Sequence, residues 1–303
     1  MSLFKFGLAA DKAALIRREL GKDAAAYFAA MQIAEAAFFR SVTTEQNQLQ
    51  LHWLQMRTGL ITRVDDSELA KLNDYSIEHA QASDIEGNKA LRRISVVTQA
   101  SLHAAMTDIS SQAWLGFDTE TAATFEKGRR NSNPISLIQI ATASHCYLFR
   151  MIDDNIAPFQ AALQPILSSD KQLKVGIGLR GDINAMKRDF EINMTHILDL
   201  NWLMNQLGAP KQMGTQQIAA SVLKLKLPKS KKVTLSNWAK PLSEPLSELQ
   251  LQYAAADTLV ALDILHQLIN LLRPYQALCP QSLQQRLAEC KKVTACFMAD
   301  TGQ

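Results

Sequence analysis

The chain has 303 residues, of which 47% are hydrophobic and 20% are charged, and its formal net charge is +3. These values are ordinary for a globular protein, and the length allows two modest domains or one large domain with an extension. The weak positive charge permits a nucleic-acid partner without requiring one, and the sequence has no run of eighteen apolar residues that would predict a transmembrane helix.

The N-terminus lacks the features of a targeting segment. Residues 1–20 contain no basic region followed by a compact apolar core and a cleavage site, and Asp11 and Glu19 argue against a transit peptide. We therefore expect a cytoplasmic protein without membrane contact. The cysteines form no CxxC pair and are expected to be structural thiols in a reducing compartment: Cys146, Cys279, Cys290 and Cys296.

Helical spacing dominates the first part of the chain. The alanine-rich stretch Ala24–Arg40 has apolar residues at helical spacing, and a further helix is expected from about Thr44 to Arg57, before Gly59. No chemical motif accompanies these helices. Amphipathic helices of this kind most often pack on a neighbouring domain or on a second copy. We therefore expect residues 1–90 to be a helical extension and linker that serves homo-oligomerisation or substrate gating.

The composition changes near residue 92, where β-branched and apolar runs begin. The first expected elements are a strand at 92–97, a helix at 99–109, and strands at 114–118, 135–141 and 146–150. Because short connections join the last three strands, they are expected to form an antiparallel meander.

Helices and strands alternate in the rest of the chain. The expected elements are helices at 159–167 and 182–190, strands at 173–179 and 195–200, and a mostly helical stretch at 201–272 with one long helix from Ser247 to Leu272. This order predicts an α/β domain in which a mixed sheet carries helices on both faces.

Two carboxylates end the strand that starts at Trp114. Asp118 and Glu120 are two residues apart, so their side chains lie on the same face of a strand. Like charges held this close disfavour each other's ionisation, and a divalent cation would relieve the repulsion. Taken alone, the pair is also consistent with a strand that ends in a solvated acidic loop.

A third carboxylate, Asp182, follows the strand at 173–179 and is expected at the N-terminus of a helix, where aspartate is a common cap. The preceding segment Gly176–Gly181 matches the GxGxxG pattern, and Asp199 follows at the distance expected for dinucleotide binding. The first two glycines fall inside an apolar strand and not in a turn, so this interpretation is disfavoured. Asp182 nevertheless lies at the carboxyl end of a strand, where α/β sheets bind ligands.

The long helix carries the last candidates, Tyr253 and Asp257. They are four residues apart and therefore lie one turn apart on one helix face. This face is mostly apolar, and a buried phenol or carboxylate needs a partner. A hydrogen bond between the two residues is one explanation, and a shared site is the other.

The three acidic segments resemble the motifs of the DEDD superfamily of 3′–5′ exonucleases and occur in the family order. Phe117-Asp118-Thr119-Glu120 is similar to the first motif, Gly181-Asp182 with the following helix to the second, and Tyr253-x-x-x-Asp257 to the third in its tyrosine (DEDDy) form. Gln252 stands where the histidine form would have its histidine. The resemblance covers about residues 94–272 and is closest to Werner-type exonuclease domains and their bacterial relatives, with ribonuclease D further away.

This resemblance implies a ribonuclease H-like domain at residues 91–275, with a tail at 276–303. It also implies a catalytic set of five residues: Asp118, Glu120, Asp182, Tyr253 and Asp257. The four carboxylates would hold two Mg²⁺ or Mn²⁺ ions, with Asp118 bridging both, and Tyr253 would orient the attacking water. The expected product is a nucleoside 5′-monophosphate released from a 3′ end.

Substrate contacts are less well defined by the sequence. The candidates are Thr119, Arg180, Lys187, Arg188, Lys231, Lys232 and Trp238. The lysines belong to a basic run at 224–232 that either follows the phosphates of a strand or forms a solvated loop. Trp238 is either a base-stacking residue or a core residue.

Three functions are compatible with these observations. The first is a metal-dependent 3′–5′ exonuclease that acts on DNA. The second is an exoribonuclease with the same mechanism, because one site can serve both polymers. The third is a nucleic-acid-binding module that has lost activity, against which the presence of all five site residues counts.

Overall fold

A computed structural model describes residues 45–77, 92–122, 133–209, 212–227, 233 and 235–290. Its central feature is a six-stranded sheet with the order β2-β5-β4-β3-β6-β7. The strands are β2 (Arg93–Val96), β3 (Trp114–Thr121), β4 (Ile135–Ala141), β5 (His145–Arg150), β6 (Leu173–Gly176) and β7 (Ile197–Asp199). β3, β4 and β5 form the expected antiparallel meander, and all other neighbours in the sheet are parallel.

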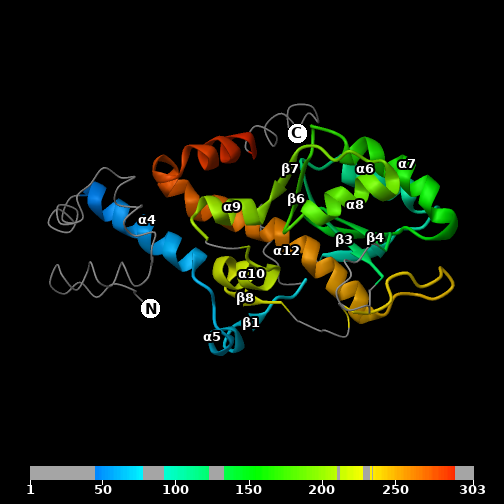
Figure 1. Ribbon diagram of the computed structural model, residues 1–303, viewed down its shortest axis with the longest axis horizontal. Coiled ribbons are helices and arrows are strands. Elements are labelled where there is room, and N and C mark those ends of the chain that lie inside the picture. Colours follow the sequence, from blue (N-terminus) through cyan, green and yellow to red (C-terminus); the bar gives the residue numbers. More distant parts are fainter. Residues whose placement is uncertain are drawn as a thin grey trace.

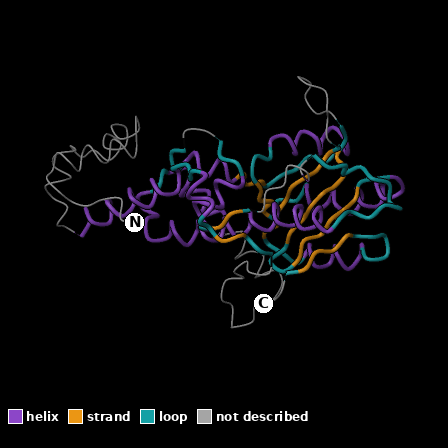
Figure 2. The backbone as a smooth tube through the Cα atoms, turned by 90° about the horizontal axis from the view of Figure 1, so that it is seen from below, coloured by secondary structure: helices purple, strands orange, loops and turns teal. Residues whose placement is uncertain are grey.

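Helices surround this sheet (Figure 1). They are α4 (Glu45–Ile61), α5 (Asp66–Ala70), α6 (Leu102–Ser110), α7 (Ile156–Leu167), α8 (Arg180–Phe190), α9 (Leu200–Gln206), α10 (Thr215–Leu223) and α12 (Glu248–Leu272). Two 3₁₀ turns, η1 (Asp153–Asn155) and η2 (Arg273–Leu278), complete the set, and residues 281–290 are also helical. Figure 2 shows the strands gathered in one half of the molecule, while the other half is mostly helical.

The two faces of the sheet bury different hydrophobic clusters. All residues of β4 are buried, and they alternate between the faces. Ile138 and Ile140 pack with side chains of α7 and α8, whereas Leu137 and Ala141 pack with α12. The mixed α/β architecture predicted from the sequence is therefore confirmed, because a strand buried on both sides requires helices on both sides.

The long helix α12 lies directly against β3. A Cβ atom added at Gly116 would come within 2.5 Å of the backbone oxygen of Thr258, so glycine is the residue that permits this close approach. Gly116, Asp118 and Glu120 share a strand face because they are two residues apart. The contact therefore brings α12 to the face from which the two carboxylates project.

A buried polar cluster joins the N-terminal part of the described chain to α12. The Arg92 guanidinium donates to both carboxylate oxygens of Asp263, at 2.8 and 2.6 Å, and the Tyr75 hydroxyl donates to the same carboxylate at 2.7 Å. Burial and the charge of Asp263 raise the pKa of Tyr75 far above its usual range, so the phenol stays neutral. Each member has a hydrogen-bond partner, as buried polar groups require.

Residues 45–77 share the core of the sheet domain. Trp53, Leu54 and Leu60 of α4 are buried in the cluster that contains α12. β1 (Asn73–Asp74) pairs in parallel with β8 (Leu225–Lys226), which lies about 150 residues later in the chain. The domain boundary expected near residue 90 stays a prediction. Residues 45–77 nevertheless make the contacts of a core element.

The C-terminal part of the described chain also packs on α12. Leu283, Leu287 and Cys290 are buried in the same cluster. The stretch Glu248–Leu278 is long and apolar enough to span a membrane by length and composition. However, 67% of its most apolar segment is buried inside the structure. Burial of this extent is what the central helix of a packed domain shows.

Some element boundaries differ from those predicted. The strand expected at 173–179 ends at Gly176, because Gly178 adopts a φ of +78° and turns the chain out of the sheet. The next helix begins at Arg180, so Asp182 lies in its first turn and is not its cap. The helices expected before residue 45 lie outside the described residues.

Candidate active site

Asp118 and Glu120 lie in the second half of β3, before an irregularity in its pairing with β4 at Glu120 and Thr121. One carboxylate oxygen of Asp118 accepts a hydrogen bond of 2.9 Å from the backbone amide of Thr119. Both side chains lie where β3 leaves the buried part of the sheet. A regular strand thus fixes the direction of two acidic groups.

Asp182 comes to the same place from α8. Its position in the first turn of that helix follows from the tight turn after β6, which pairs directly with β3. The hydroxyl of Thr119 donates a hydrogen bond to the Asp182 carboxylate. Thr119, predicted as a substrate contact, therefore links the second acidic segment to the first.

Tyr253 and Asp257 are supplied by α12, one helical turn apart. Asp257 immediately precedes Thr258, the residue whose backbone touches Gly116. The negative charge of Asp257 raises the pKa of both Asp118 and Glu120, which shows how close the three carboxylates lie. The four carboxylates predicted from separate segments thus lie close together beside β3, and Tyr253 shares a pocket lining with Asp257.

The electrostatics of these carboxylates are unfavourable in the absence of a cation. Burial, followed by the charges of Asp182, Asp257 and Glu120, raises the pKa of Asp118 well above its usual value. Burial and the charges of Asp257 and Asp182 raise the pKa of Glu120 to about 8. The pKa of Asp182 is raised by burial, although the hydrogen bond from Thr119 opposes that shift.

These residues fit a divalent cation. Carboxylate oxygens are the ligands preferred by Mg²⁺ and Mn²⁺, and positive charge would relieve the repulsion that raises the pKa values. Among the residues that the structure describes, no three His, Cys, Asp or Glu side chains already stand in a metal-binding arrangement.

Asp199 supports the site, and the sequence did not indicate this role. Its carboxylate accepts hydrogen bonds from the backbone amides of Gly178, Leu179 and Asn201, at 2.9, 3.1 and 2.9 Å. It thus holds the turn that leads into α8 and also caps α9. An aspartate at the end of a strand and before a helix was the available signal, because that pattern is typical of a cap.

The predicted substrate contacts on α8 have different surroundings. Arg180 and Lys187 are exposed on this helix. Arg188 forms a bidentate ion pair with Asp189, with one distance of 2.7 Å, and also donates to the backbone oxygen of Asn133 at 3.2 Å. Arg188 therefore already has protein partners, whereas Arg180 and Lys187 stay proposed substrate contacts.

The remaining predicted contacts lie near α12 or outside the described residues. Trp238 is only 1% exposed, and its ring centroid lies 6.2 Å from that of Tyr253. This burial is that of a core residue, which was one of the two roles expected for Trp238. Lys231 and Lys232 are not among the described residues, and Lys226 lies 3.7 Å from the carboxylate of Asp74.

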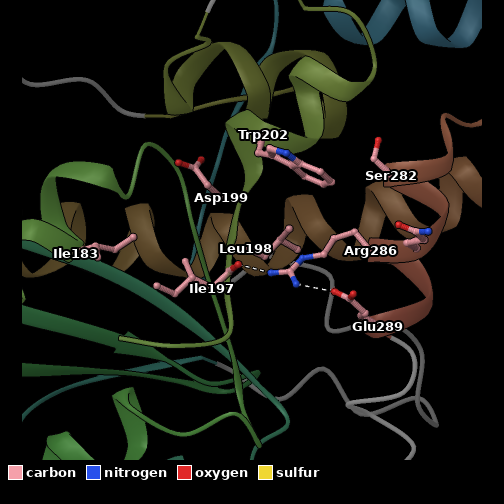
Figure 3. Close-up of a pocket in the computed structure, with 9 residues that line it drawn as sticks. Ile183, Ile197, Leu198, Asp199, Trp202, Ser282, Arg286 and Glu289 are labelled. Carbon is pink, nitrogen blue, oxygen red and sulfur yellow. Dashed lines mark hydrogen bonds and ion pairs between the residues drawn. The ribbon is translucent and has the colours of Figure 1, made fainter. Parts of the chain in front are cut away.

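One pocket lies apart from the five acidic and phenolic residues. It measures about 550 Å³ and lies between β7, α9 and the helix at 281–290 (Figure 3). Arg286 crosses it to donate to the backbone oxygen of Ile197 and pairs with Glu289 at 2.7 Å. A smaller pocket of about 150 Å³ includes Tyr253 and Asp257 in its lining.

Comparisons with known proteins identify the family of the chain. A family model described as 3′-5′ exonuclease matches residues 94–273. The chain is 30% identical over 159 residues to the mouse (Mus musculus) bifunctional 3′-5′ exonuclease/ATP-dependent helicase WRN, which covers 52% of this chain and 11% of that protein. It is 31% identical over 152 residues to an Arabidopsis thaliana 3′-5′ exonuclease, with 50% of each covered. The matched region thus spans half or less of these relatives.

Solved structures show the same architecture. The Nibbler EXO domain of Aedes aegypti gives a TM-score of 0.55 at 25% identity and covers 65% of this chain and 95% of that chain. Escherichia coli RNase D, described as an exoribonuclease involved in structured RNA processing, gives a TM-score of 0.52 at 21% identity, with 66% and 50% covered. The second likeness shows the fold alone.

Proposed function

Because the chain belongs to the 3′-5′ exonuclease family of the DEDD superfamily, we propose that it hydrolyses phosphodiester bonds from the 3′ end of DNA and releases nucleoside 5′-monophosphates. The observation that carries this proposal is the convergence of four carboxylates from β3, α8 and α12: burial raises the pKa of Asp118, Glu120 and Asp182, and repulsion by the other carboxylates adds to the shift for Asp118 and Glu120. Such a set of oxygen ligands is suited to divalent cations and to phosphate chemistry.

The family generally uses divalent metal ions, and we propose two, Mg²⁺ or Mn²⁺. Asp118, Glu120 and Asp257 would hold one ion, and Asp118 with Asp182 would hold the other. Bound there, the ions would supply Lewis acidity toward the scissile phosphate and lower the pKa of water. The other requirements of the reaction fall to the residues of the chain.

Tyr253 would orient the water that attacks. A tyrosine hydroxyl both donates and accepts hydrogen bonds, so it would serve as a hydrogen-bond partner of the water and not as the base. Its ring packs near the buried Trp238, which fixes its direction on α12. Arg180 and Lys187, exposed near Asp182 on α8, would contact the phosphates of the substrate strand.

The choice of DNA rests on the sequence relatives. The matches at 30% identity or more include the WRN exonuclease/helicase, whereas the ribonuclease D structures are related at 19–23% identity. A second candidate, an exoribonuclease, is supported by the fold that the chain shares with those structures, one of which is a Trypanosoma brucei RNase D complex with RNA. The catalytic chemistry is the same in both cases.

The decisive experiment is a panel of 5′-labelled DNA and RNA oligonucleotides, single- and double-stranded, with Mg²⁺ or Mn²⁺. We expect shortening from the 3′ end, faster on DNA, and no shortening by Asp118→Ala. Faster cleavage of RNA would replace the first candidate by the second. If the wild-type protein binds these oligonucleotides but leaves all of them intact with either metal, the chain is a binding module and the enzymatic proposal is wrong.

Homo-oligomerisation or gating by residues 1–90 stays a proposal, because much of this segment lies outside the described residues. Light scattering would test it directly. A monomeric mass, together with unchanged activity after removal of residues 1–44, would contradict it.

A further inference from the structure

The side chain of Gln139 lies beside Asp118 on the sheet. β4 pairs with β3 in the antiparallel direction, and the register places Gln139 directly opposite Asp118. Residues that face each other in an antiparallel pair have their side chains on the same side of the sheet, with Cβ atoms about 4.5–5.5 Å apart. The carboxamide of Gln139 is therefore within reach of the Asp118 carboxylate.

The residues around Gln139 show which face of the sheet it occupies. Leu137 and Ala141 of β4 and Leu148, which pairs with Gln139 from β5, all belong to the hydrophobic cluster around α12. Because side chains alternate along a strand, Gln139 points to the same face as Leu137 and Ala141. Its side chain is thus enclosed between the sheet and α12, the helix that also supplies Asp257.

The carboxamide of Gln139 is buried without a hydrogen bond. The residue is 0% exposed, and neither the amide nitrogen nor the amide oxygen has a partner in the part of the chain that the structure describes. Most buried polar atoms in folded proteins are hydrogen-bonded, since an unpaired one costs free energy. Gln139 therefore keeps an unused donor and an unused acceptor next to the acidic site.

The Asp118 carboxylate can accept a further hydrogen bond. It accepts one from the backbone amide of Thr119, at 2.9 Å, through its Oδ1 atom. An ionised carboxylate has two oxygens with about four lone-pair positions, so a cation and a second donor can both bind to it. Carboxylates that bind metal ions are themselves hydrogen-bonded by neighbouring groups, and these bonds fix their orientation. An amide donor beside Asp118 suits this role.

We propose that Gln139 is a positioning residue, whose amide nitrogen donates a hydrogen bond to the Asp118 carboxylate and fixes its orientation for cation binding. The proposal rests on the proposed function, in which Asp118 is a ligand of both cations. Formation of this bond needs rotation of side chains but no movement of the backbone, because the register already sets the two residues opposite each other. Gln139 itself contacts neither the cations nor the substrate.

The test replaces Gln139 by methionine, which has a similar length and volume but no amide. Thermal unfolding is measured in a chelator and at a series of Mn²⁺ concentrations, because a ligand of the folded state raises the unfolding temperature according to its affinity. In the chelator, Gln139→Met should unfold at the wild-type temperature or above it, since it buries no unpaired amide. Its affinity for Mn²⁺ should be about tenfold to a hundredfold weaker.

A matched control is Gln172→Met, which removes a buried carboxamide that has protein partners. Gln172 is 4% exposed and donates to the backbone oxygens of Ile109 and Ser110, at 3.4 and 3.3 Å. Because these bonds are lost, Gln172→Met should unfold at a lower temperature in the chelator but bind Mn²⁺ as the wild type does. Gln139→Leu is a second test variant, and it should lose Mn²⁺ affinity as Gln139→Met does.

Oligonucleotide cleavage by the same proteins separates this proposal from the proposed function. Gln139→Met should lose activity at low Mn²⁺ and recover most of it at saturating Mn²⁺, with the KM for the oligonucleotide unchanged. If the wild-type protein shortens oligonucleotides but Gln139→Met binds Mn²⁺ with wild-type affinity, only the role of Gln139 is wrong. If the wild-type protein binds Mn²⁺ but shortens no oligonucleotide, the function is wrong, and weaker Mn²⁺ binding by Gln139→Met would still support the role of Gln139.

Discussion

Asp118 shows how the needs of catalysis and of stability conflict at one residue. Its carboxyl group is buried among three other carboxylates, and each of these raises its pKa. An unfolded chain exposes the same group to water, where it ionises freely at neutral pH. Folding without a cation must therefore either protonate the group or bury a repelled charge, and both reduce the stability of the fold.

We predict that Asp118→Asn stabilises the metal-free protein while it abolishes nuclease activity. The amide has nearly the same shape and carries no charge, so the free energy of unfolding should rise by about 1–3 kcal/mol at pH 7. Thermal unfolding in the presence of a chelator measures this difference. A variant that unfolds at a lower temperature than the wild type would contradict the electrostatic account of the site.

Lys174 gives a prediction about pH. Its side chain is fully buried in β6, and its amine donates to the backbone oxygen of Gln172 at 2.9 Å. Burial lowers its pKa to about 8 from a usual value of about 10.5. Between these two values the unfolded chain binds more protons than the folded chain, so stability must rise with pH across this window.

We therefore expect the free energy of unfolding to increase by about 2–3 kcal/mol between pH 8 and pH 10.5 because of Lys174. Urea unfolding at a series of pH values would measure the increase. The same series on Lys174→Met should lack this component. Parallel pH profiles for the two proteins would show that Lys174 has the same pKa in the folded and the unfolded chain, and would contradict this prediction.

At the scale of single residues, the sequence predicted the acidic site residues but not the residues that hold them in position. Asp118, Glu120 and Asp182 follow apolar runs, and such strand ends are readable from periodicity. The role of Asp199 depends on hydrogen bonds to a turn that forms only when β6 and β7 pair. The burial of Trp238 likewise depends on packing against α12, which no local pattern encodes.

At the scale of secondary-structure elements, the site depends on how α12 lies on β3. Two of the five residues come from the helix and two from the strand, so any shift between these elements changes the distances within the site. The contact of Gly116 with the Thr258 backbone sets the separation. The glycine is therefore a positioning residue, although it has no functional group.

We predict that Gly116→Ala lowers both stability and activity. The added methyl group would lie 2.5 Å from the Thr258 oxygen, so α12 must move away. Such overpacking costs about 1–3 kcal/mol, and displacement of catalytic groups by about 1 Å can reduce the rate about a hundredfold. Chemical unfolding and the oligonucleotide assay measure the two effects.

Gly59→Ala is the control for this substitution. Gly59 lies in α4, and a Cβ atom there would meet nothing within 4 Å. Alanine should stabilise that helix slightly, by about 0.5–1 kcal/mol. If both glycine variants behaved alike, close packing of α12 on β3 would not explain the effect of Gly116→Ala.

Periodicity predicted most elements of the sheet domain with good boundaries. The expected strand at 135–141 is β4, and the long helix begins where Ser247 caps it. Boundaries failed where tertiary contacts bend the chain, as at Gly178, whose amide is held by Asp199. The pairing of β1 with β8 joins two strands of two residues each, and runs this short have no readable period.

At the scale of the whole molecule, the described core extends beyond the region that matches the family. That match begins at residue 94, yet Trp53, Leu54 and Tyr75 are buried in the cluster around α12. Tyr75 also completes the hydrogen-bonded cluster with Arg92 and Asp263. Residues 45–77 are therefore part of what stabilises the nuclease fold.

We predict that removal of residues 1–77 strongly destabilises the protein. The loss exposes the apolar surface that α4 covers, and each large side chain removed from a core costs about 2–5 kcal/mol. Removal of residues 1–44 leaves every contact named above in place and serves as the control. Circular dichroism during heating would compare the two. A protein that lacks residues 1–77 and unfolds at the wild-type temperature would show that this packing contributes nothing.

The parallel pairing of β1 with β8 also has a consequence for synthesis on the ribosome. The partner strand of β1 is made about 150 residues after β1 itself, which takes roughly ten to thirty seconds at ordinary elongation rates. Throughout that interval the buried side chains of α4 have no completed surface to cover. The newly made chain must therefore keep the apolar side chains of α4 soluble, alone or with a chaperone, until α12 leaves the exit tunnel and the two ends of the core can close together.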